Sequence, residues 1–316
     1  MRAIAAGADV VGIEDGWEGL IDGRFRPLTR DDVRGIIRRG GTILGTSRKD
    51  PYVHGDGYAS VAATVAAADI ATLIVIGGDG SLRTAARLHA NGLPVVGIPK
   101  TIDNDIGGTD VTLGFYTAVQ IVVDAIDRLT TTAESHNRVM VVEVMGRTAG
   151  WIAAYAGMAG GAEAILVPED PTDYEALAAR LIERHHSGPD YSVVVVAEGA
   201  PGPGGEVASR GPDHFGFQRL GGVGDDVARA IEQSTGFEAR VMTLGYLQRG
   251  GTPNAFDRIL GTRFGVRAAE LAIDGQGGLM VGLRGDEIIS VDLQEASSSP
   301  RPLDASFLDT AAWFLA

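Results

Sequence analysis

Short runs of β-branched residues alternate along this chain with longer, alanine-rich segments of helical character. Such alternation predicts βαβ units, in which parallel strands form sheets covered by helices on both faces. The predicted strands are 9–13, 72–77, 94–98, 138–144, 191–197 and 239–245, and the predicted helices lie near 81–91, 112–129, 148–158, 173–187, 220–235 and 255–274. A chain of 316 residues is long enough for two α/β domains of this kind.

Three segments do not fit this alternation. Residues 199–217, "GAPGPGGEVASRGPDHFGF", are rich in Gly and Pro and predict a long loop. Residues 296–302, "ASSSPRP", predict a turn or a short surface excursion. Residues 1–7 resemble the end of a helix, but the strand that usually precedes the first helix of such a fold is missing from the sequence.

The charge balance excludes several classes of partner. The chain has 41 acidic and 27 basic residues, a net charge of −14 and no cysteine. An acidic protein lacks the basic surface that nucleic acids and anionic membranes require, and neither a spanning apolar run nor a signal-peptide pattern is found. The absence of cysteine excludes disulfides and thiolate metal sites, so we expect a cytoplasmic protein.

Five polar motifs each follow directly after a predicted strand. They are "GGDGS" (77–81), "PKTIDND" (99–105), "MGRTAGW" (145–151), "EG" (198–199) and "GYLQRGG" (245–251). Ligands of open α/β sheets bind outside the carboxyl ends of the strands. We therefore expect these motifs to converge on one binding site.

The motif "GGDGS" reads as a strand, a glycine-rich turn and a helix whose N-cap is Ser81. The free N–H groups of that helix would bind phosphate oxygens. The Asp79 carboxylate would repel phosphate unless a divalent cation lies between them. The alternative is a tight turn in which Asp79 only caps the helix.

The motif "PKTIDND" carries two acids two positions apart. In an extended segment, Asp103 and Asp105 would point the same way, which suits one acid as a base and the other near a metal. The alternative is a loop in which both acids accept bonds from backbone donors.

Arginines supply the counter-charge for an anionic substrate. The arginines at strand ends or in glycine-rich turns are Arg48, Arg138, Arg147, Arg240 and Arg249. The guanidinium fork suits phosphate recognition, although a surface ion pair is the alternative for each one. A phosphate cradle, acids and arginines together indicate phosphoryl transfer. The histidines have no metal-site spacing, and Trp151 is the only tryptophan beside a motif.

The segments "GGDGS", "PKTIDNDI", "ESHNRVMVVEVMGRTAGW", "EG" and "LGYLQRGGTPNAFDR" resemble, in this order, the 6-phosphofructokinase family, in a mixed actinobacterial-like form. The resemblance implies an α/β fold of two Rossmann-like three-layer domains with mostly parallel sheets. Residues 1–114 plus 248–295 would form the phosphoryl-donor domain, and 115–247 plus 296–316 the fructose 6-phosphate domain. The family normally begins with a strand and a "GGDxPGxN" loop, so the resemblance implies an N-terminally truncated fold that lacks the first strand.

The resemblance also implies roles for individual residues. Asp103 would be the base for the 1-hydroxyl of fructose 6-phosphate, Arg147 would steady the transition state, and Thr101 would contact the transferred group. The residues implied for the donor, ATP or pyrophosphate, are Arg48, Gly78, Asp79, Gly80, Ser81 and Lys100, with Mg²⁺ on Asp79 and Asp105. Those implied for the sugar phosphate are Thr101, Asp103, Arg138, Met145, Gly146, Arg147, Glu198, Arg240, Tyr246 and Arg249.

The resemblance further implies a homo-oligomer, a dimer or a tetramer, in which Arg138 and Arg240 complete the neighbouring subunit's site. Two positions depart from the family pattern. Tyr246 stands where many bacterial relatives carry His. Thr130 stands where allosteric bacterial enzymes carry an effector-binding Arg, which argues against regulation at that pocket.

Two residues disagree about the donor. In the family, Gly80 is typical of ATP-dependent enzymes, whereas Lys100 is typical of pyrophosphate-dependent ones. We favour ATP because a flexible lysine can swing aside, and pyrophosphate is the alternative. Two further alternatives are a lipid or NAD kinase that shares only "GGDG", and a non-catalytic paralogue or fragment.

Overall fold

The computed structural model describes residues 1–53, 56–212 and 218–314. The chain divides into two compact units: unit 1 comprises 1–101, 106–114 and 251–300, and unit 2 comprises 102–105, 115–250 and 301–316. The prediction of an α/β fold with mostly parallel sheets is confirmed. The chain passes between the units at slightly different residues from those expected, and which ligand each unit binds stays a prediction.

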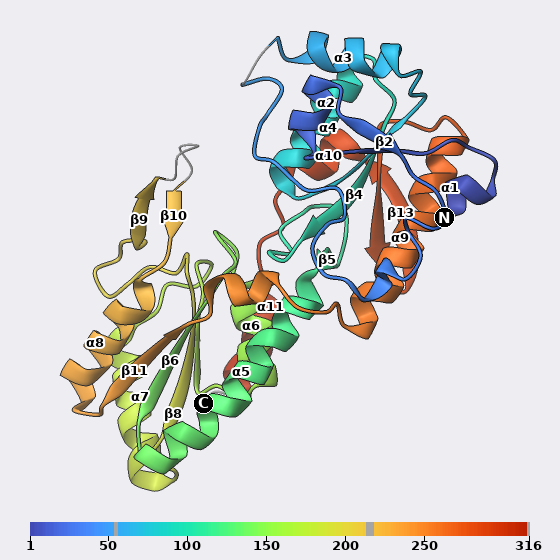
Figure 1. Ribbon diagram of the computed structural model, residues 1–316. Helices are drawn as coiled ribbons and strands as arrows, with labels where there is room; N and C mark the ends of the chain where they lie inside the picture. The colour runs from blue at the N-terminus through green and yellow to red at the C-terminus, as the bar shows by residue number, and fades with distance from the viewer. Residues whose placement is uncertain (54–55, 213–217, 315–316) are drawn as a thin grey trace. The chain divides into compact units, whose positions relative to one another are not determined.

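Unit 1 contains a mixed sheet. Its strands are β3 (Leu73–Gly77), β4 (Val95–Thr101), β12 (Leu279–Arg284) and β13 (Glu287–Asp292), in the order β13-β12-β4-β3, and β5 (Leu113–Gly114) pairs with the end of β4. The strands β3, β4 and β12 are parallel, whereas β13 returns antiparallel to β12. Figure 1 shows α4 (Asp79–Ala90) and α10 (Leu293–Ser298) on one face and α9 (Ala255–Ile273) on the other.

The core of unit 1 lies under α4 and α10. Leu82 and Leu88 of α4 and Leu293 of α10 pack with Val95 of β4. The helix α3 (Tyr58–Ala67) adds Val61 and Val65 to the same cluster. The prediction of a turn at 296–302 is wrong for its first half, because α10 continues to Ser298 and buries Ala296 against this core.

The N-terminal part of unit 1 begins with α1 (Arg2–Ala5), as predicted, and Arg2 lies 3.3 Å from Glu270 of α9. The predicted strand at 9–13 exists as β1 (Val11–Ile13), but it does not join the parallel sheet. It pairs antiparallel with β2 (Phe25–Pro27), with α2 (Trp17–Asp22) between them, and η1 (Ile36–Arg38) follows. A parallel crossover needs a dozen or more residues, whereas only residues 14–24 connect β1 to β2, which favours the antiparallel pairing.

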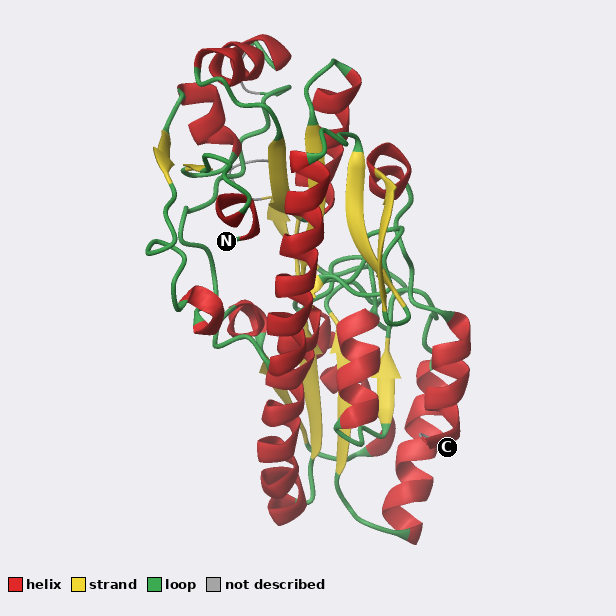
Figure 2. Ribbon diagram, turned by 90° about the vertical axis from the view of Figure 1, so that its right-hand side faces the viewer, coloured by secondary structure: helices red, strands yellow, loops and turns green. Residues whose placement is uncertain are grey.

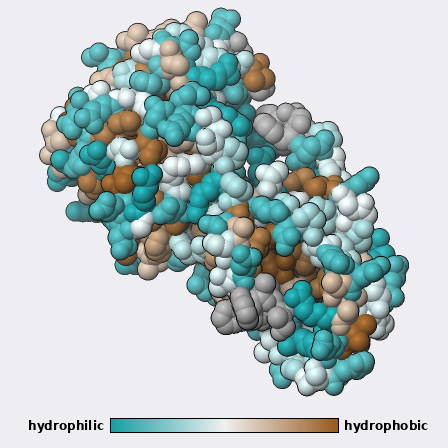
Figure 3. All heavy atoms as spheres, turned by 180° about the vertical axis from the view of Figure 1, so that it is seen from behind, coloured by the Kyte–Doolittle hydropathy of each residue, from teal (hydrophilic) through white to brown (hydrophobic). Residues whose placement is uncertain are grey.

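The strand β3 departs from the expected burial. Ile74 is 39% exposed and Ile76 is 59% exposed. Among the strands that the structure describes, only β4 pairs with β3, so β3 forms an edge of the sheet. The expectation of strands buried on both faces is therefore wrong for β3. Figure 3 shows apolar patches among the mostly polar surface of the molecule.

Unit 2 contains a fully parallel sheet of β11 (Ala239–Thr243), β6 (Val139–Val144), β8 (Ser192–Ala197) and β7 (Ala164–Leu166), in that order. All residues of β6 and β8 are buried, as their continuous apolar sequences predict. The helices are α5 (Phe115–His136), α6 (Trp151–Ala159), α7 (Tyr174–Ser187), α8 (Val223–Thr235) and α11 (Ala305–Phe314). Figures 1 and 2 show helices on both faces of this sheet.

The segment 199–217 is not simply a loop. Its end forms β9 (Ser209–Pro212), which pairs antiparallel with β10 (Gln218–Leu220), and residues 213–217 lie outside the described residues. Within the described ranges, no helix is both long and apolar enough to cross a membrane.

A buried acid joins β6 to α8. Glu143 is 3% exposed. Its carboxylate accepts hydrogen bonds from the backbone N–H groups of Gly222, at 3.0 and 3.1 Å, and of Gly224, at 2.8 Å. A negative group at a helix N-terminus satisfies donors that the helix itself cannot pair.

We expect Glu143→Ala to lower the free energy of unfolding by about 2–5 kcal/mol, because the N–H groups of the partly buried Gly222 and the buried Gly224 lose their acceptor. Glu143→Gln, which keeps one acceptor oxygen, should cost less. Urea denaturation of each variant measures this. The matched control is Glu134→Ala on the exposed face of α5, where a change within about 0.5 kcal/mol is expected. A Glu143→Ala variant as stable as this control would contradict the capping role.

Candidate functional site

The polar motifs of unit 1 meet at one edge of its sheet. The parallel strands β3 and β4 place Gly77 opposite Pro99. The turn that follows Gly77 and the residues Lys100 and Thr101 therefore lie at the same carboxyl edge. A Cβ added to Gly78 would lie 3.4 Å from Cβ of Thr101, so the two segments lie close together.

The helix α4 begins earlier than predicted. Its N-cap is Gly78 and its first residue is Asp79, with no side chain capping it. The prediction that Ser81 is the N-cap is wrong, because Ser81 lies in the first turn. The structure does not support Asp79 as a side-chain cap either. Helix geometry leaves the N–H groups of this first turn without intrahelical partners, which is the arrangement that binds anions.

The glycines of "GGDGS" provide space rather than unusual backbone angles. None of Gly77, Gly78 and Gly80 has a positive φ. A Cβ at Gly77 would lie 2.4 Å from Cβ of Ser81, so the turn closes only with glycine there. A Cβ at Gly80 would meet no atom within 4 Å. The helix terminus is therefore open beside Gly80.

Two further candidate residues of unit 1 have exposed side chains, Arg48 and Lys100. The segment around Arg48 is anchored by its neighbours. Ser47 Oγ accepts the N–H of Glu18, and Lys49 Nζ lies 2.6 Å from Glu18 Oε1. The Asp79 carboxylate lies 2.5 Å from the Arg83 guanidinium, one turn along α4.

The segment 102–105 belongs to unit 2 and is not extended. Asn104 has a φ of +56°, a conformation that asparagine adopts more readily than most residues. The prediction that Asp103 and Asp105 point the same way assumed an extended backbone, which the structure does not have at these residues. Asp103 is 6% exposed, and the N–H of Arg301 donates to the carbonyl of Asp105 at 2.9 Å.

The turn after β6 is tight and unusual. Gly146 has a φ of +146° and Arg147 a φ of +55°. The N–H of Arg147 donates to Glu198 Oε1 at 3.1 Å. A Cβ on Gly199 would lie 1.9 Å from the carbonyl oxygen of Arg147, so only glycine fits there. Both residues of the motif "EG" therefore stabilise this turn. Glu198 binds the N–H of Arg147, and Gly199 leaves space for the Arg147 carbonyl.

The pKa of Glu198 is shifted by its surroundings. Burial raises the pKa of Glu198 above its ordinary value, and the nearby Asp103 carboxylate acts in the same direction. The N–H of Arg147 and the charge of Arg249 oppose this rise. The Glu198 carboxylate thus binds the backbone N–H of Arg147 and interacts with the charges of Asp103 and Arg249, all within unit 2.

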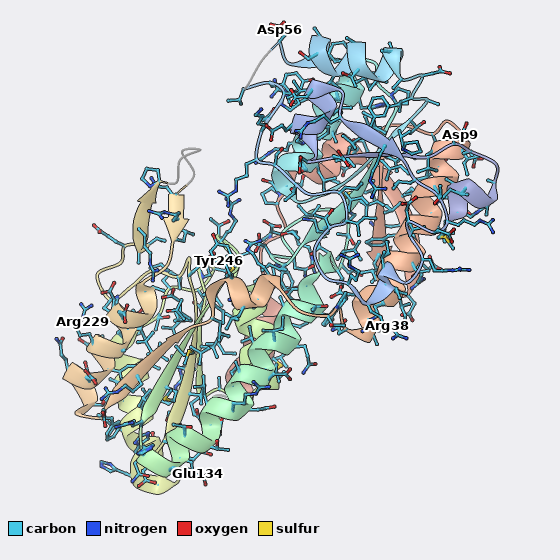
Figure 4. The ribbon with its side chains drawn as sticks, in the orientation of Figure 1. Asp9, Arg38, Asp56, Glu134, Arg229 and Tyr246 are labelled. Carbon is cyan, nitrogen blue, oxygen red and sulfur yellow. The ribbon has the colours of Figure 1, made fainter. Side chains whose placement is uncertain are left out.

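Gln248 lies within the motif "GYLQRGG", but nothing in the sequence predicted a role for it. It is 1% exposed. Its Oε1 accepts the N–H of Met145 at 3.2 Å, and its Nε2 donates to the carbonyl of Gly245. Gln248 thereby joins the turn after β6 to η2 (Gly245–Arg249), where Tyr246 is exposed (Figure 4). No local signal distinguishes this glutamine, because its partner lies 103 residues away.

Arg138 and Arg240 do not join these residues within unit 2. Both lie at the amino end of their parallel strands, where Val139 is opposite Ala239, whereas the other candidates lie at the carboxyl end. Glu238 contacts both, at 2.8 Å from Nε of Arg138 and through NH2 of Arg240. Figure 4 shows Glu134, at the end of α5 that leads to Arg138, at the opposite end of unit 2 from Tyr246.

Among the described residues, acidic and histidine side chains do not gather into a ready metal site. Within the described part of the chain, no group of three or more could hold a metal ion by itself.

Comparison with known proteins places the chain among relatives of both donor types. Residues 1–272 match the family described as Phosphofructokinase. The chain is 51% identical to a "Pyrophosphate--fructose 6-phosphate 1-phosphotransferase" of Amycolatopsis methanolica, over 93% of this chain and 86% of the relative. It is 50% identical to an "ATP-dependent 6-phosphofructokinase" of Corynebacterium efficiens, over 92% of this chain and 85% of the relative.

A solved structure agrees with these matches. Phosphofructokinase from Saccharomyces cerevisiae superposes with a TM-score of 0.82 at 31% identity, over 94% of this chain and 42% of the yeast chain. The alternative of a lipid or NAD kinase is therefore wrong. The motifs at the carboxyl edges of the two sheets, the fold and the matched sequence agree that the chain belongs to the phosphofructokinase family.

Proposed function

We propose that this protein transfers a phosphoryl group to the 1-hydroxyl of fructose 6-phosphate, giving fructose 1,6-bisphosphate, with ATP as the favoured donor. The observation that carries the proposal is the set of Asp103, Arg147 and Glu198 in unit 2, in which one acid is buried and the other binds the arginine's turn. We place this reaction in the cytoplasm.

Asp103 acts as the base. It takes the proton from the 1-hydroxyl, the oxygen forms a bond to the terminal phosphorus, and the bond from that phosphorus to the bridging oxygen breaks. The Arg147 guanidinium and the Thr101 hydroxyl stabilise charge on the transferred group. A buried carboxylate is shielded from water, which strengthens its interaction with a substrate hydroxyl.

The donor binds to unit 1. The first turn of α4 offers the N–H groups of Asp79, Gly80 and Ser81 after Gly78, and Arg48 and Lys100 add positive charge. Asp79 and Asp105 are each a proposed ligand of Mg²⁺, which when bound neutralises charge on the donor phosphates. The open space beside Gly80 supports ATP, whereas the exposed Lys100 supports pyrophosphate.

The sugar phosphate binds to unit 2. Met145, Gly146, Glu198, Tyr246 and Arg249 are the proposed ligands from the same subunit. Arg138 and Arg240 lie at the other edge of the sheet, which supports their proposed role in the site of a neighbouring subunit of a dimer or tetramer.

We expect Asp103→Asn to lower kcat by about 10²–10⁴-fold, the ordinary contribution of a general base. Binding of fructose 6-phosphate should persist, measured by titration calorimetry. The matched control is Asp110→Asn, an exposed acid of unit 1, whose kcat should stay within about twofold. An Asp103→Asn variant that keeps wild-type kcat would remove Asp103 as the base, and wild-type chain without turnover on either donor would support the non-catalytic alternative.

The donor is tested by assaying ATP and pyrophosphate in parallel. We expect higher kcat/KM with ATP, and a loss of at least about 100-fold for ATP in Gly80→Asp. A carboxylate about 4 Å from a phosphate oxygen costs about 4 kcal/mol at an effective dielectric of about 20, and a Cβ at position 80 would meet no atom within 4 Å. Ala90→Asp, at the far end of α4, is the control for added charge. Turnover with pyrophosphate alone would show the alternative donor to be correct.

Shared sites are tested by mixing inactive subunits. Asp103→Asn and Arg138→Ala should each be poorly active alone. In a randomly assembled dimer, half of the molecules are mixed and each mixed molecule has one intact site, so co-expression should restore roughly a quarter of wild-type activity. Activity no greater than the average of the parents would show that Arg138 serves its own subunit or neither.

A further inference from the structure

Trp151, which the proposed reaction does not use, binds a segment far away in the sequence. Its indole N–H donates to the carbonyl of Arg301 at 3.0 Å. The Arg301 guanidinium lies 4.1 Å from the centroid of the Trp151 ring, in a cation–π contact. Trp151 is 2% exposed, so this contact is made at a buried ring.

A second bond fixes the same segment beside Trp151. The Glu169 carboxylate accepts the N–H of Gly150, at 3.0 Å, and the N–H of Leu303, also at 3.0 Å. Residues 301–303, here called the strap, are therefore bound twice to residues 150–151. Further along, Phe307 stacks on Tyr155 of α6, with 4.4 Å between the ring centroids.

The strap also holds the segment that carries Asp103. The N–H of Arg301 donates to the carbonyl of Asp105 at 2.9 Å. Arg301 thus uses its amide for Asp105 and its carbonyl and guanidinium for Trp151. Arg301 therefore binds both the segment that carries Asp103 and the segment that follows Arg147.

Trp151 in turn belongs to the motif that carries Arg147. The turn closes through the N–H of Ala149, which donates to the carbonyl of Gly146 at 3.0 Å. α6 then begins at Trp151, four residues after Arg147. A continuous path of bonds therefore runs from the Arg147 turn through Trp151 and Arg301 to the Asp103–Asp105 segment.

We propose that Trp151 and Arg301 are positioning residues that fix the Asp103–Asp105 segment relative to the Arg147 turn. Their effect on the reaction rests on the proposed function, whereas the path of bonds does not. Because the segment 102–105 contains a left-handed residue and is not part of a strand, sheet pairing does not fix it. A misplacement of about 1 Å in a reacting group can cost about 100-fold in rate.

The kinetic test uses Trp151→Phe, which removes the indole N–H, and Arg301→Met, which removes the cation and keeps the stem. We expect kcat to fall about 10–100-fold in both, with KM for fructose 6-phosphate changed by less than about threefold. Arg301→Lys should recover most of kcat, because a cation over the ring is restored. The controls are Trp17→Phe in unit 1 and Arg229→Met on α8, which should leave kcat unchanged.

A second measurement needs no substrate. Hydrogen–deuterium exchange of the Arg301 amide should be faster in Trp151→Phe and Arg301→Met than in the wild type or either control, because the bond to Asp105 is loosened. Unchanged exchange, or a kcat loss no larger than that of Trp17→Phe, would overturn the positioning role. A wild-type chain without fructose 6-phosphate turnover would instead contradict the proposed function, and the exchange result would still decide whether the path of bonds holds.

Discussion

The turn at Gly146 and Arg147 is the constraint on which unit 2 depends. A non-glycine residue in the left-handed region costs on the order of 1–3 kcal/mol and persists only where its surroundings enforce it. Here Glu198 binds the Arg147 N–H, and Gly199 lets the Arg147 carbonyl approach closely. Gln248 holds the preceding residue, Met145. The backbone at Arg147 is therefore held by residues that follow β8 and β11, because the carboxyl ends of neighbouring parallel strands lie side by side.

The two units differ in the chemical groups that they offer to a ligand: backbone N–H groups in unit 1 and carboxylates in unit 2. Unit 1 offers an uncapped helix terminus and space beside Gly80, which suit an anionic and bulky ligand. Unit 2 offers the buried Asp103 carboxylate and the partly buried Glu198, whose pKa is raised by its burial. Thr101 ends β4 in unit 1 and Asp103 lies in unit 2, so the main chain itself joins the two kinds of group within three residues.

The sequence predicted what depends on local pattern and missed what depends on distant contacts. The strands β3, β4, β6 and β8 were found because each contains a run of adjacent apolar residues, and β11 was found although Arg240 interrupts it. The prediction of Ser81 as N-cap was wrong because the helix begins two residues before Ser81, at Asp79, directly after the glycine pair at the end of β3. The segment 102–105 was misread because a single left-handed asparagine carries no pattern. Glu143, Gln248 and Arg301 were missed since each acts on a backbone group about 80 or more residues away.

The positions of Arg138 and Arg240 constrain the proposal most strongly. A parallel strand rises about 3.3 Å per residue, so the seven steps from Arg138 to Met145 span roughly 23 Å. That distance exceeds the reach of an arginine side chain, and within one chain Glu238 occupies both guanidinium groups. If these arginines bind the sugar phosphate, they bind it on another copy of the chain, and the ligand must replace Glu238. In that case the complete site forms only in an oligomer, because a single chain holds Arg138 and Arg240 at the amino ends of the strands, away from the other candidate residues.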